Sequence, residues 1–175
     1  MKYIALLRGI NVGGNSLVKM ADLKREMEEL GCANVKTVIA SGNVMFDSKL
    51  GEKSITKKLE TGLSAAFNMN IKVVVRTMAE VKQVIAHAPK NWEKGDDIRK
   101  YVAFVRLPAK PEDVIAEIKL REGIDSVDSW DGVVYMTTKL SGITKSGFSK
   151  LAGKKIYKEI TIRNYTTVKK LVDIA

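Results

Sequence analysis

The feature that most constrains the fold is an order of strand-like and helix-like segments that occurs twice along the chain. Alternating or continuous apolar runs predict strands, and apolar residues spaced by three and four positions predict helices. We expect strands at 2–8, 35–40, 44–48, 71–77, 101–107, 125–130, 133–138 and 159–163, and helices at 20–30, 53–67, 78–88, 111–121, 144–154 and 166–173. Each half therefore has the order strand, helix, strand, strand, helix, strand, and then one further helix.

Local signals support several of these boundaries. Thr77 and Glu80 have the spacing of a capping box at a helix start, and Pro111 suits a first helical turn. The sequences "SGN" at 41–43 and "DG" at 131–132 each separate two strand-like runs, as hairpin turns do.

This order predicts an α+β fold with two ferredoxin-like (βαββαβ) subdomains in tandem, each followed by an extra helix. The polar, charged segment 89–100 is the best boundary between them. The expected domains are therefore 1–90 and 98–175, packed as one compact unit. The residues of the two halves do not align well, which indicates a repeat of pattern rather than of sequence.

Composition excludes several classes of protein. The 175 residues are 45% hydrophobic, which is enough for a sizeable core. Apolar runs all fall short of the roughly 18–20 residues of a membrane span, and the run at the start is predicted to be a strand rather than a signal peptide. With one cysteine, Cys32, and one histidine, His87, neither an intrachain disulfide nor a Cys/His zinc site is expected. We expect a cytoplasmic protein with no metal, no cofactor and no membrane partner.

The net charge of +10 has two interpretations. A basic protein attracts nucleic acid and phosphate-bearing ligands. The basic residues are spread over the whole chain, however, which is also typical of a lysine-rich solvated surface.

The segment "RGINVGGN" at 8–15 connects the first expected strand to the first helix. Glycine-rich connections of this kind hold phosphate when backbone N–H groups point at the anion. The segment matches neither the Walker pattern G-x-x-x-x-G-K-[ST] nor the dinucleotide pattern G-x-G-x-x-G. Two interpretations remain, an anion-binding loop assisted by Arg8 and Lys19, or a flexible turn.

Topology indicates which loops meet this segment. In a split βαβ unit, the connection after the first strand and the hairpin between the second and third strands emerge at the same end of the sheet. We therefore expect Arg8, Asn11 and Asn15 to lie near Ser41 and Asn43, although about 30 residues of chain separate them.

Sequence patterns for catalysis are weak. Ser41 lacks the G-x-S-x-G context of a hydrolase nucleophile, and His87 is expected on the surface of a helix. Cys32 follows a helix-ending glycine and is expected to be partly buried and inert. Whether the chain is an enzyme stays undecided.

An RNA-recognition platform needs aromatic side chains interleaved on the sheet. The corresponding strands hold only Tyr3 and Phe46, which argues against that platform. Binding to a nucleic-acid backbone alone stays open.

The C-terminal stretch "ITIRNYTTVKKLVDIA" places an Arg–Asn pair directly before a helix. Arg163, Asn164 and Thr167 would bring a guanidinium, an amide and a helix start together, as in the first connection. The alternative is a helix start tied down by local hydrogen bonds.

The motifs "LLRGINVGGN", "VKMADL", "IASGNVMFDS", "VVVRT" and "TIRNYTTVKKL" are similar to those of the bacterial proteins grouped as domain of unknown function 1697. The resemblance runs from residue 3 to about 172. It implies a compact cytoplasmic α+β protein with paired ferredoxin-like subdomains, in a family without an established activity. The motif positions that it implies are Arg8, Gly9, Asn11, Val12, Gly13, Lys19, Met20, Leu23, Ser41, Gly42, Asn43, Arg76, Arg163, Asn164, Thr167 and Lys170.

Our main hypothesis is a cytoplasmic binding protein for an anionic, phosphate-containing small molecule. Loops concentrate binding residues, and these loops combine guanidinium, amide and hydroxyl groups. Two alternatives stay open, an enzyme acting on a phosphorylated metabolite and a protein that binds a nucleic-acid backbone. Ligand identity and oligomeric state are not determined. The expected ligand-binding residues are Arg8, Asn11, Gly13, Ser41, Asn43, Arg163 and Asn164.

Overall fold

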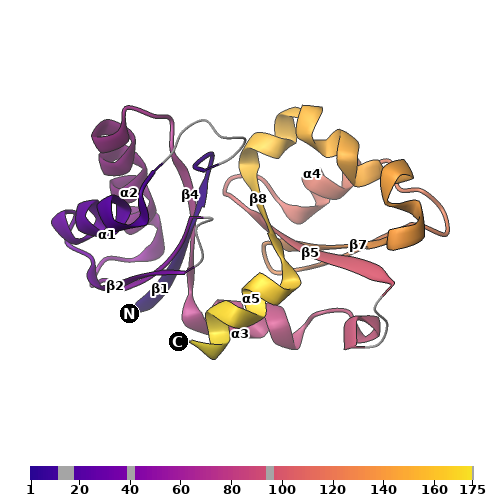
Figure 1. Ribbon diagram of the computed structural model, residues 1–175, viewed down its shortest axis with the longest axis horizontal. Coiled ribbons are helices and arrows are strands. Elements are labelled where there is room, and N and C mark those ends of the chain that lie inside the picture. Colours follow the sequence, from indigo (N-terminus) through magenta and orange to yellow (C-terminus); the bar gives the residue numbers. More distant parts are fainter. Residues whose placement is uncertain (12–17, 39–41, 94–96, 175) are drawn as a thin grey trace. The chain divides into compact units, whose positions relative to one another are not determined.

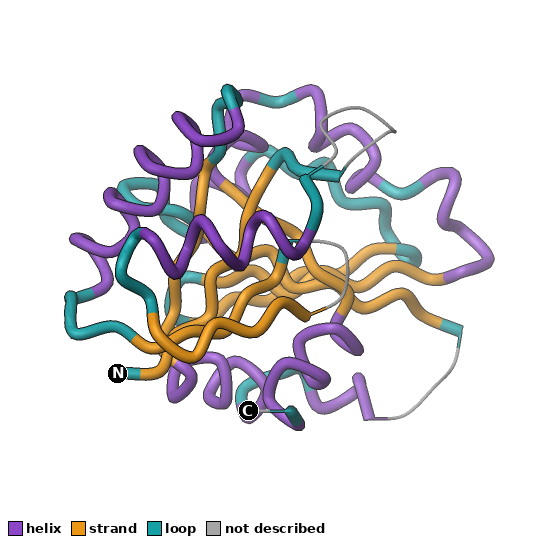
Figure 2. The backbone as a smooth tube through the Cα atoms, turned by 60° about the vertical axis from the view of Figure 1, so that its left-hand side comes forward, coloured by secondary structure: helices purple, strands orange, loops and turns teal. Residues whose placement is uncertain are grey.

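The computed structural model describes residues 1–11, 18–38, 42–93 and 97–174 (Figure 1). The fold is mixed α+β, with two four-stranded antiparallel sheets and several helices, which Figure 2 distinguishes by colour. The chain divides into two compact units, Met1–Val81 and Lys82–Ile174. Among the described residues, the structure contains no helix with the length and apolar content needed to cross a membrane.

The N-terminal unit contains the first sheet, in the strand order β2-β3-β1-β4. Helices α1 and α2 cover one face of it, and buried residues of both helices pack with those of the strands into one core. Apolar side chains at helical spacing, such as Leu23 and Met27 in α1, supply the helical side of that core. The elements are β1 (Lys2–Arg8), α1 (Met20–Glu29), β2 (Ala33–Val38), β3 (Asn43–Asp47), α2 (Glu52–Phe67), β4 (Lys72–Thr77) and α3 (Met78–Ala86), of which the last crosses into the second unit.

The C-terminal unit contains the second sheet, in the strand order β6-β7-β5-β8. Its core joins one face of the sheet to α4 and to short 3-10 helices. The elements are η1 (Lys90–Glu93), β5 (Ile98–Val105), α4 (Pro111–Ala116), β6 (Asp125–Trp130), β7 (Val133–Lys139), η2 (Leu140–Lys145), η3 (Gly147–Gly153), η4 (Lys155–Glu159), β8 (Ile160–Asn164) and α5 (Tyr165–Asp173).

The predicted order of strands is confirmed, and two helix predictions are corrected. The helix expected at 111–121 ends at Ala116. The helix expected at 144–154 is wrong, because η2 and η3 occupy that region. Gly147 packs so closely against the carbonyl of Lys119 that only glycine fits, and its N–H donates to Asp125 Oδ2 at 2.8 Å. These tertiary contacts interrupt the apolar pattern that predicted an α-helix.

The division between the units falls within α3, whereas the sequence placed a boundary in the polar segment 89–100. The expected domains, 1–90 and 98–175, stay a prediction.

The strands β1, β3 and β4 of the first sheet correspond residue by residue to β5, β7 and β8 of the second. Ile4 of β1 lies opposite Arg76 of β4, and Val102 of β5 lies opposite Arg163 of β8. This register aligns "KYIALLR" at 2–8 with "KYVAFVR" at 100–106. Our statement that the halves repeat only in pattern is therefore corrected, because these strands also match in sequence.

Candidate functional site

The end of β1 and the β2–β3 hairpin lie side by side in the N-terminal unit. The N–H of Leu7 donates to the carbonyl of Gly42 at 2.7 Å. A Cβ atom added to Gly42 would lie 3.0 Å from the side chain of Ile10. The expected meeting of these two connections is thus confirmed for the described residues. Arg8 is the last residue of β1 at this end of the sheet, and it is half-buried.

Backbone conformation at this end of the sheet requires special residues. Gly9 has φ +80° and Gly42 has φ +71°, in the left-handed region that favours glycine. Asn11 has φ 54°, a conformation that asparagine tolerates better than most residues. Gly9 therefore turns the chain at the start of the first connection, as one of the two interpretations of this segment expects, whereas Gly13 and Gly14 lie outside the described residues.

The side chain of Asn11 joins the two ends of the first connection. Its Nδ2 donates to the carbonyl of Val18 at 3.0 Å, and its Oδ1 accepts from the N–H of Val18 at 2.8 Å. Both ends of the amide are thus used to hold the chain. Gly13, the next expected site residue, lies outside the described residues.

Asn43 is completely buried. Its Nδ2 donates to the carbonyl of Val38 at 3.2 Å, across the hairpin between β2 and β3. A buried amide needs such a partner, since an unsatisfied one costs free energy. Asn43 therefore positions the hairpin. Ser41, the remaining expected residue of this hairpin, lies outside the described residues.

Arg163 and Asn164 occupy the end of β8 in the C-terminal unit. The Nη1 of Arg163 donates to Thr161 Oγ1 at 2.8 Å and to the carbonyl of Ile162 at 3.0 Å. These bonds run back along β8, and burial lowers the pKa of the guanidinium to about 10. Arg163 is therefore still charged at neutral pH.

Asn164 is exposed and stands at the N-cap of α5, and within the described residues its side chain makes no cap hydrogen bond. The hydrogen bonds recorded for Arg163 thus point away from the helix start at which Asn164 is found. The sequence hypothesis grouped these two residues, which are consecutive in the chain, Arg163 in β8 and Asn164 at the N-cap of α5.

A third arginine, Arg76 of β4, is neutralised within the N-terminal unit. Its Nη1 lies 3.0 Å from Glu52 Oε1 and also donates to the carbonyl of Val75 at 2.8 Å. Burial raises the pKa of Glu52, and the neighbouring Arg76 opposes that rise. This motif position therefore has a structural partner.

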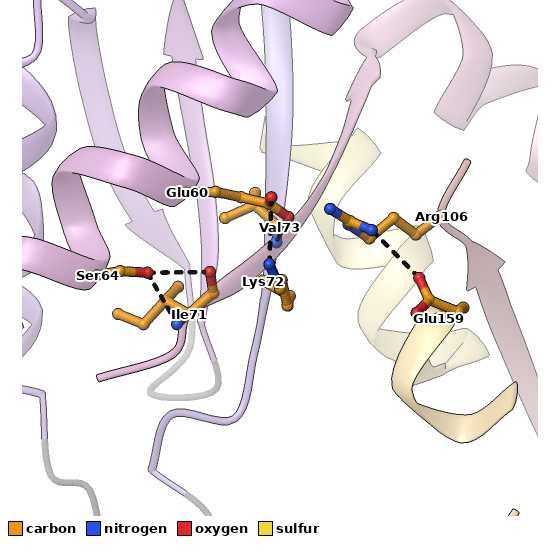
Figure 3. A network of polar contacts seen from close by, with 7 residues as sticks. All are labelled: Glu60, Ser64, Ile71, Lys72, Val73, Arg106 and Glu159. Carbon is orange, nitrogen blue, oxygen red and sulfur yellow. Dashed lines mark hydrogen bonds and ion pairs between the residues drawn. The ribbon is translucent and has the colours of Figure 1, made fainter. Parts of the chain in front are cut away.

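Polar contacts also fix the first residues of β4 (Figure 3). Ser64 Oγ accepts from the N–H of Ile71 at 3.0 Å, and Glu60 Oε1 accepts from the N–H of Val73 at 3.0 Å. The other oxygen of Glu60 lies 3.8 Å from Lys72 Nζ. In the C-terminal unit, Figure 3 shows the ion pair of Arg106 and Glu159, at 3.2 Å.

Cys32 and His87 carry side chains that catalytic sites often use, and the structure describes both. Burial raises the pKa of the Cys32 thiol to about 11, so the thiol is protonated at neutral pH. His87 is exposed beyond the end of α3 and stacks on Trp130, with ring centroids 4.2 Å apart. In the part of the chain that the structure describes, no three His, Cys, Asp or Glu side chains are grouped to hold a metal ion.

A surface hollow of about 540 Å³ lies beside α1, β2 and β3. Lys2, at the other end of β1 from Arg8, is part of its lining. The lining combines lysines with acidic side chains, including Glu28 and Asp47. This hollow is separate from the candidate site.

Comparison with known proteins places the chain in a family. A family model described as "Protein of unknown function (DUF1697)" matches residues 1–135. The chain belongs to this family. The resemblance found in the sequence is thereby confirmed, and no specific function is indicated. Arg8 and the hairpin fall within the matched residues, whereas Arg163 and Asn164 fall beyond them.

The fold is also similar to a solved structure, a conserved bacterial protein from Streptococcus pneumoniae. The two chains are 26% identical, with a TM-score of 0.85. The similarity covers 99% of this chain and 97% of that chain. The search of curated proteins found no match.

Proposed function

We propose that this chain is a cytoplasmic binding protein for an anionic, phosphate-containing small molecule, which binds at the end of the first sheet beside Arg8. The observation that carries the proposal is the contact between the end of β1 and the hairpin, through Leu7, Gly42 and Ile10. It supports the idea that two loops serve one site. The ferredoxin-like topology of each unit belongs to the same proposal, and the strand orders β2-β3-β1-β4 and β6-β7-β5-β8 support it.

The expected site residues have different roles in this proposal. Arg8 contacts the anion, since a guanidinium can donate two parallel hydrogen bonds to one phosphate group. Asn11 and Asn43 hold the two loops that surround it. Gly13 and Ser41 are assigned to the ligand from the sequence alone. Asn164, at the start of α5, and Arg163 remain a second candidate position for an anionic group.

Binding can be tested without knowing the ligand. A panel of inorganic phosphate, pyrophosphate, sugar phosphates and nucleotides is screened for a rise in the melting temperature. A ligand at 100 times its Kd stabilises the folded state by about 2.7 kcal/mol. Failure of every compound, and of sulfate, would remove the support for this function.

A matched pair of variants then assigns the site. Arg8→Ala is expected to weaken binding at least tenfold. Arg25→Ala removes the same charge from an exposed position on α1, where the side chain is 60% exposed, and is expected to bind normally. Equal loss in both variants would show that binding depends on net charge alone.

The same variants separate the alternatives. An enzyme acting on a phosphorylated metabolite would convert one member of the panel into product, with Arg8 or Arg163 stabilising charge. A nucleic-acid binder would bind oligonucleotides with an affinity that falls steeply as salt rises. Binding of a small phosphate compound without turnover favours our proposal.

A further inference from the structure

We infer that the hollow beside α1, β2 and β3 is a second binding site, which takes a free amino acid. Lys36 binds the carboxylate of this small zwitterion, and Asp47 binds its ammonium group. The site is distinct from that of the proposed function, because Asp47 pairs with Lys2, at the opposite end of β1 from Arg8. Either site can therefore be absent while the other is present.

A β-bulge in β2 brings the two charged side chains to one face of the sheet. Ala33 lies opposite Asp47 of β3, and Lys36 lies opposite Met45, so β2 has one extra residue between these pairs. Side chains of directly opposed residues lie on the same face, as do those of residues two apart in one strand. Lys36, Met45 and Asp47 therefore share a face. Without the extra residue Val35 would take the place of Lys36, but Val35 is buried in the core instead.

Asn34 fixes both the bulge and the carboxylate of Asp47. Its φ of 51° lies in the left-handed region, which asparagine tolerates better than most residues. Its Nδ2 donates to Asp47 Oδ2 at 2.7 Å, and both residues line the hollow. An ionised carboxylate accepts several hydrogen bonds, so Asp47 can accept one from a ligand and keep the bond from Asn34. The acceptor for the ammonium group is thus held in position before a ligand binds.

The hollow has the size and the lining of a small-molecule site. Its volume of about 540 Å³ falls within the roughly 300–1,000 Å³ that is usual for ligand pockets. Met45 and Phe46 contribute apolar atoms to the lining. Lys36 is exposed, and within the described part of the chain it has no ion-pair partner. Its ammonium group is therefore available to a carboxylate.

The charges around the hollow favour a zwitterion over a simple anion. Acidic side chains line it together with basic ones, and on α1 Glu28 lies 3.8 Å from Lys24. A polyanion would be repelled by Glu28 and Asp47, whereas a molecule with one charge of each sign can meet an opposite charge at both ends. Lys36 and Asp47 are diagonal neighbours on their strands, and such positions lie about 7–8 Å apart, which a small molecule can bridge.

The first experiment uses the wild-type full chain and calorimetric titration. Each of the twenty common amino acids is the probe in turn, and we expect at least one to bind with a Kd below about 1 mM. The tightest is then compared with its N-acetyl derivative, which lacks the ammonium charge, and with its amide, which lacks the carboxylate. Each derivative is expected to bind about tenfold more weakly or worse. Absence of binding by every amino acid, or full affinity of either derivative, would overturn the inference.

Charge variants then assign the site. Lys36→Gln and Asp47→Asn are each expected to weaken binding about tenfold or more. An amide at the position of Asp47 can still accept from Asn34, so we expect the melting temperature to stay close to that of the wild type. Lys53→Gln and Glu122→Gln remove the same charges at exposed positions elsewhere and are expected to bind within about twofold of the wild type.

The outcomes distinguish this site from the proposed function. Wild-type affinity in Lys36→Gln, or an equal loss in the matched controls, would overturn the inference. If Asp47→Asn fails to fold, the comparison of the blocked derivatives on the wild-type chain still decides. A chain that binds an amino acid but none of the phosphate-bearing compounds would overturn the proposed function alone.

Discussion

At the scale of single residues, the polar side chains differ in whether the fold already uses their hydrogen-bonding groups. Asn11 and Asn43 are both bonded to the backbone, so each amide has a structural role, and their assignment to a ligand stays a prediction. Asp125 is a further example, because its Oδ2 accepts from the N–H groups of Arg121 and Gly147. These residues shape the chain, and their substitution should change stability before it changes binding.

Asp125 should make stability depend on pH. Burial tends to raise the pKa of its carboxyl, but the hydrogen bonds from the N–H groups of Gly147 and Arg121, together with the neighbouring hydroxyl groups of Ser146 and Thr138, lower it. A lowered pKa in the folded state stabilises the fold above the unfolded pKa of about 3.9, and this stabilisation is lost as the pH falls through the folded value. We expect Asp125→Asn to lower the free energy of unfolding at pH 7, with a difference from wild type that shrinks below about pH 4. Urea titrations across this range measure it. Glu122→Gln, at an exposed position, serves as the control and should show no comparable difference.

Gly147 should tolerate no side chain. A Cβ atom there would overlap the carbonyl of Lys119, which belongs to the backbone and cannot turn aside. We expect Gly147→Ala to destabilise the protein by roughly 1–3 kcal/mol, the usual cost of overpacking. Gly153→Ala is the matched control, because no heavy atom of the described residues lies within 4 Å of its Cβ position. Equal stability of the two variants in urea unfolding would contradict the structure at η3.

Cys32 should resist thiol reagents in the folded protein. The residue is buried, and burial raises the pKa of its thiol to about 11. The thiolate is the reactive form, so at pH 8 we expect labelling to be slow in buffer and fast in denaturant. Absorbance of a chromogenic disulfide reagent follows both reactions. Rapid labelling without denaturant would show that this part of the unit opens readily.

At the scale of elements, local signals succeeded where the partners are close in sequence. The predicted capping box is present, since Glu80 Oε2 accepts from the N–H of Thr77 at 2.6 Å and Thr77 Oγ1 accepts from the N–H of Glu80 at 3.2 Å. In the region of η2 and η3, by contrast, local signals predicted the wrong structure. Its apolar spacing is helical, but its conformation depends on Asp125 and Lys119, which lie earlier in the chain.

The capping box should contribute measurably to stability. Glu80→Ala removes the acceptor of two hydrogen bonds at the start of α3, so we expect a loss of about 0.5–2 kcal/mol. Lys82→Ala, at an exposed position of the same helix, should change the free energy of unfolding by less than about 0.5 kcal/mol. Thermal and urea unfolding of both variants make the comparison. A larger loss in Lys82→Ala would contradict the role of the cap.

At the scale of the whole molecule, one strand arrangement occurs twice with different ends. The inner strands are β1 and β3 in the first sheet and β5 and β7 in the second. The connections at the ends of these sheets differ in length and charge. Lys72, beside the first sheet's Arg8, and Glu159, beside the second sheet's Arg106, also carry opposite charges. The two sheets thus share one arrangement of strands and differ in the residues at its ends.

Hydrogen exchange should reproduce this duplication. Amides of inner strands are bonded on both sides and open only with the sheet, so they exchange most slowly. We expect the equivalent residues Ala5 and Ala103, both completely buried, to be strongly protected, and the edge strands β2 and β6 to exchange faster. Exchange measured residue by residue provides the test. Protection of β6 that equals that of β5 would contradict the strand order.

The sequence by itself determined the order of strands, the family and the ends of β1, α2 and α5 to within a residue or two. These properties follow from periodicity and capping, which act between residues that are near in the chain. It also predicted that the first connection meets the hairpin, because topology follows from element order.

Only the tertiary structure decided how the individual side chains are used. The amides of Asn11 and Asn43 form hydrogen bonds with the backbone, and Gly147 packs closely against the carbonyl of Lys119. Strand register, which pairs residues far apart in sequence, likewise assigned Arg8 and Arg106 to the same position of the two sheets. Periodicity indicates which face of an element is buried. Periodicity does not indicate which distant atoms a polar group contacts there. Those contacts distinguish a structural amide or ion pair from a binding residue.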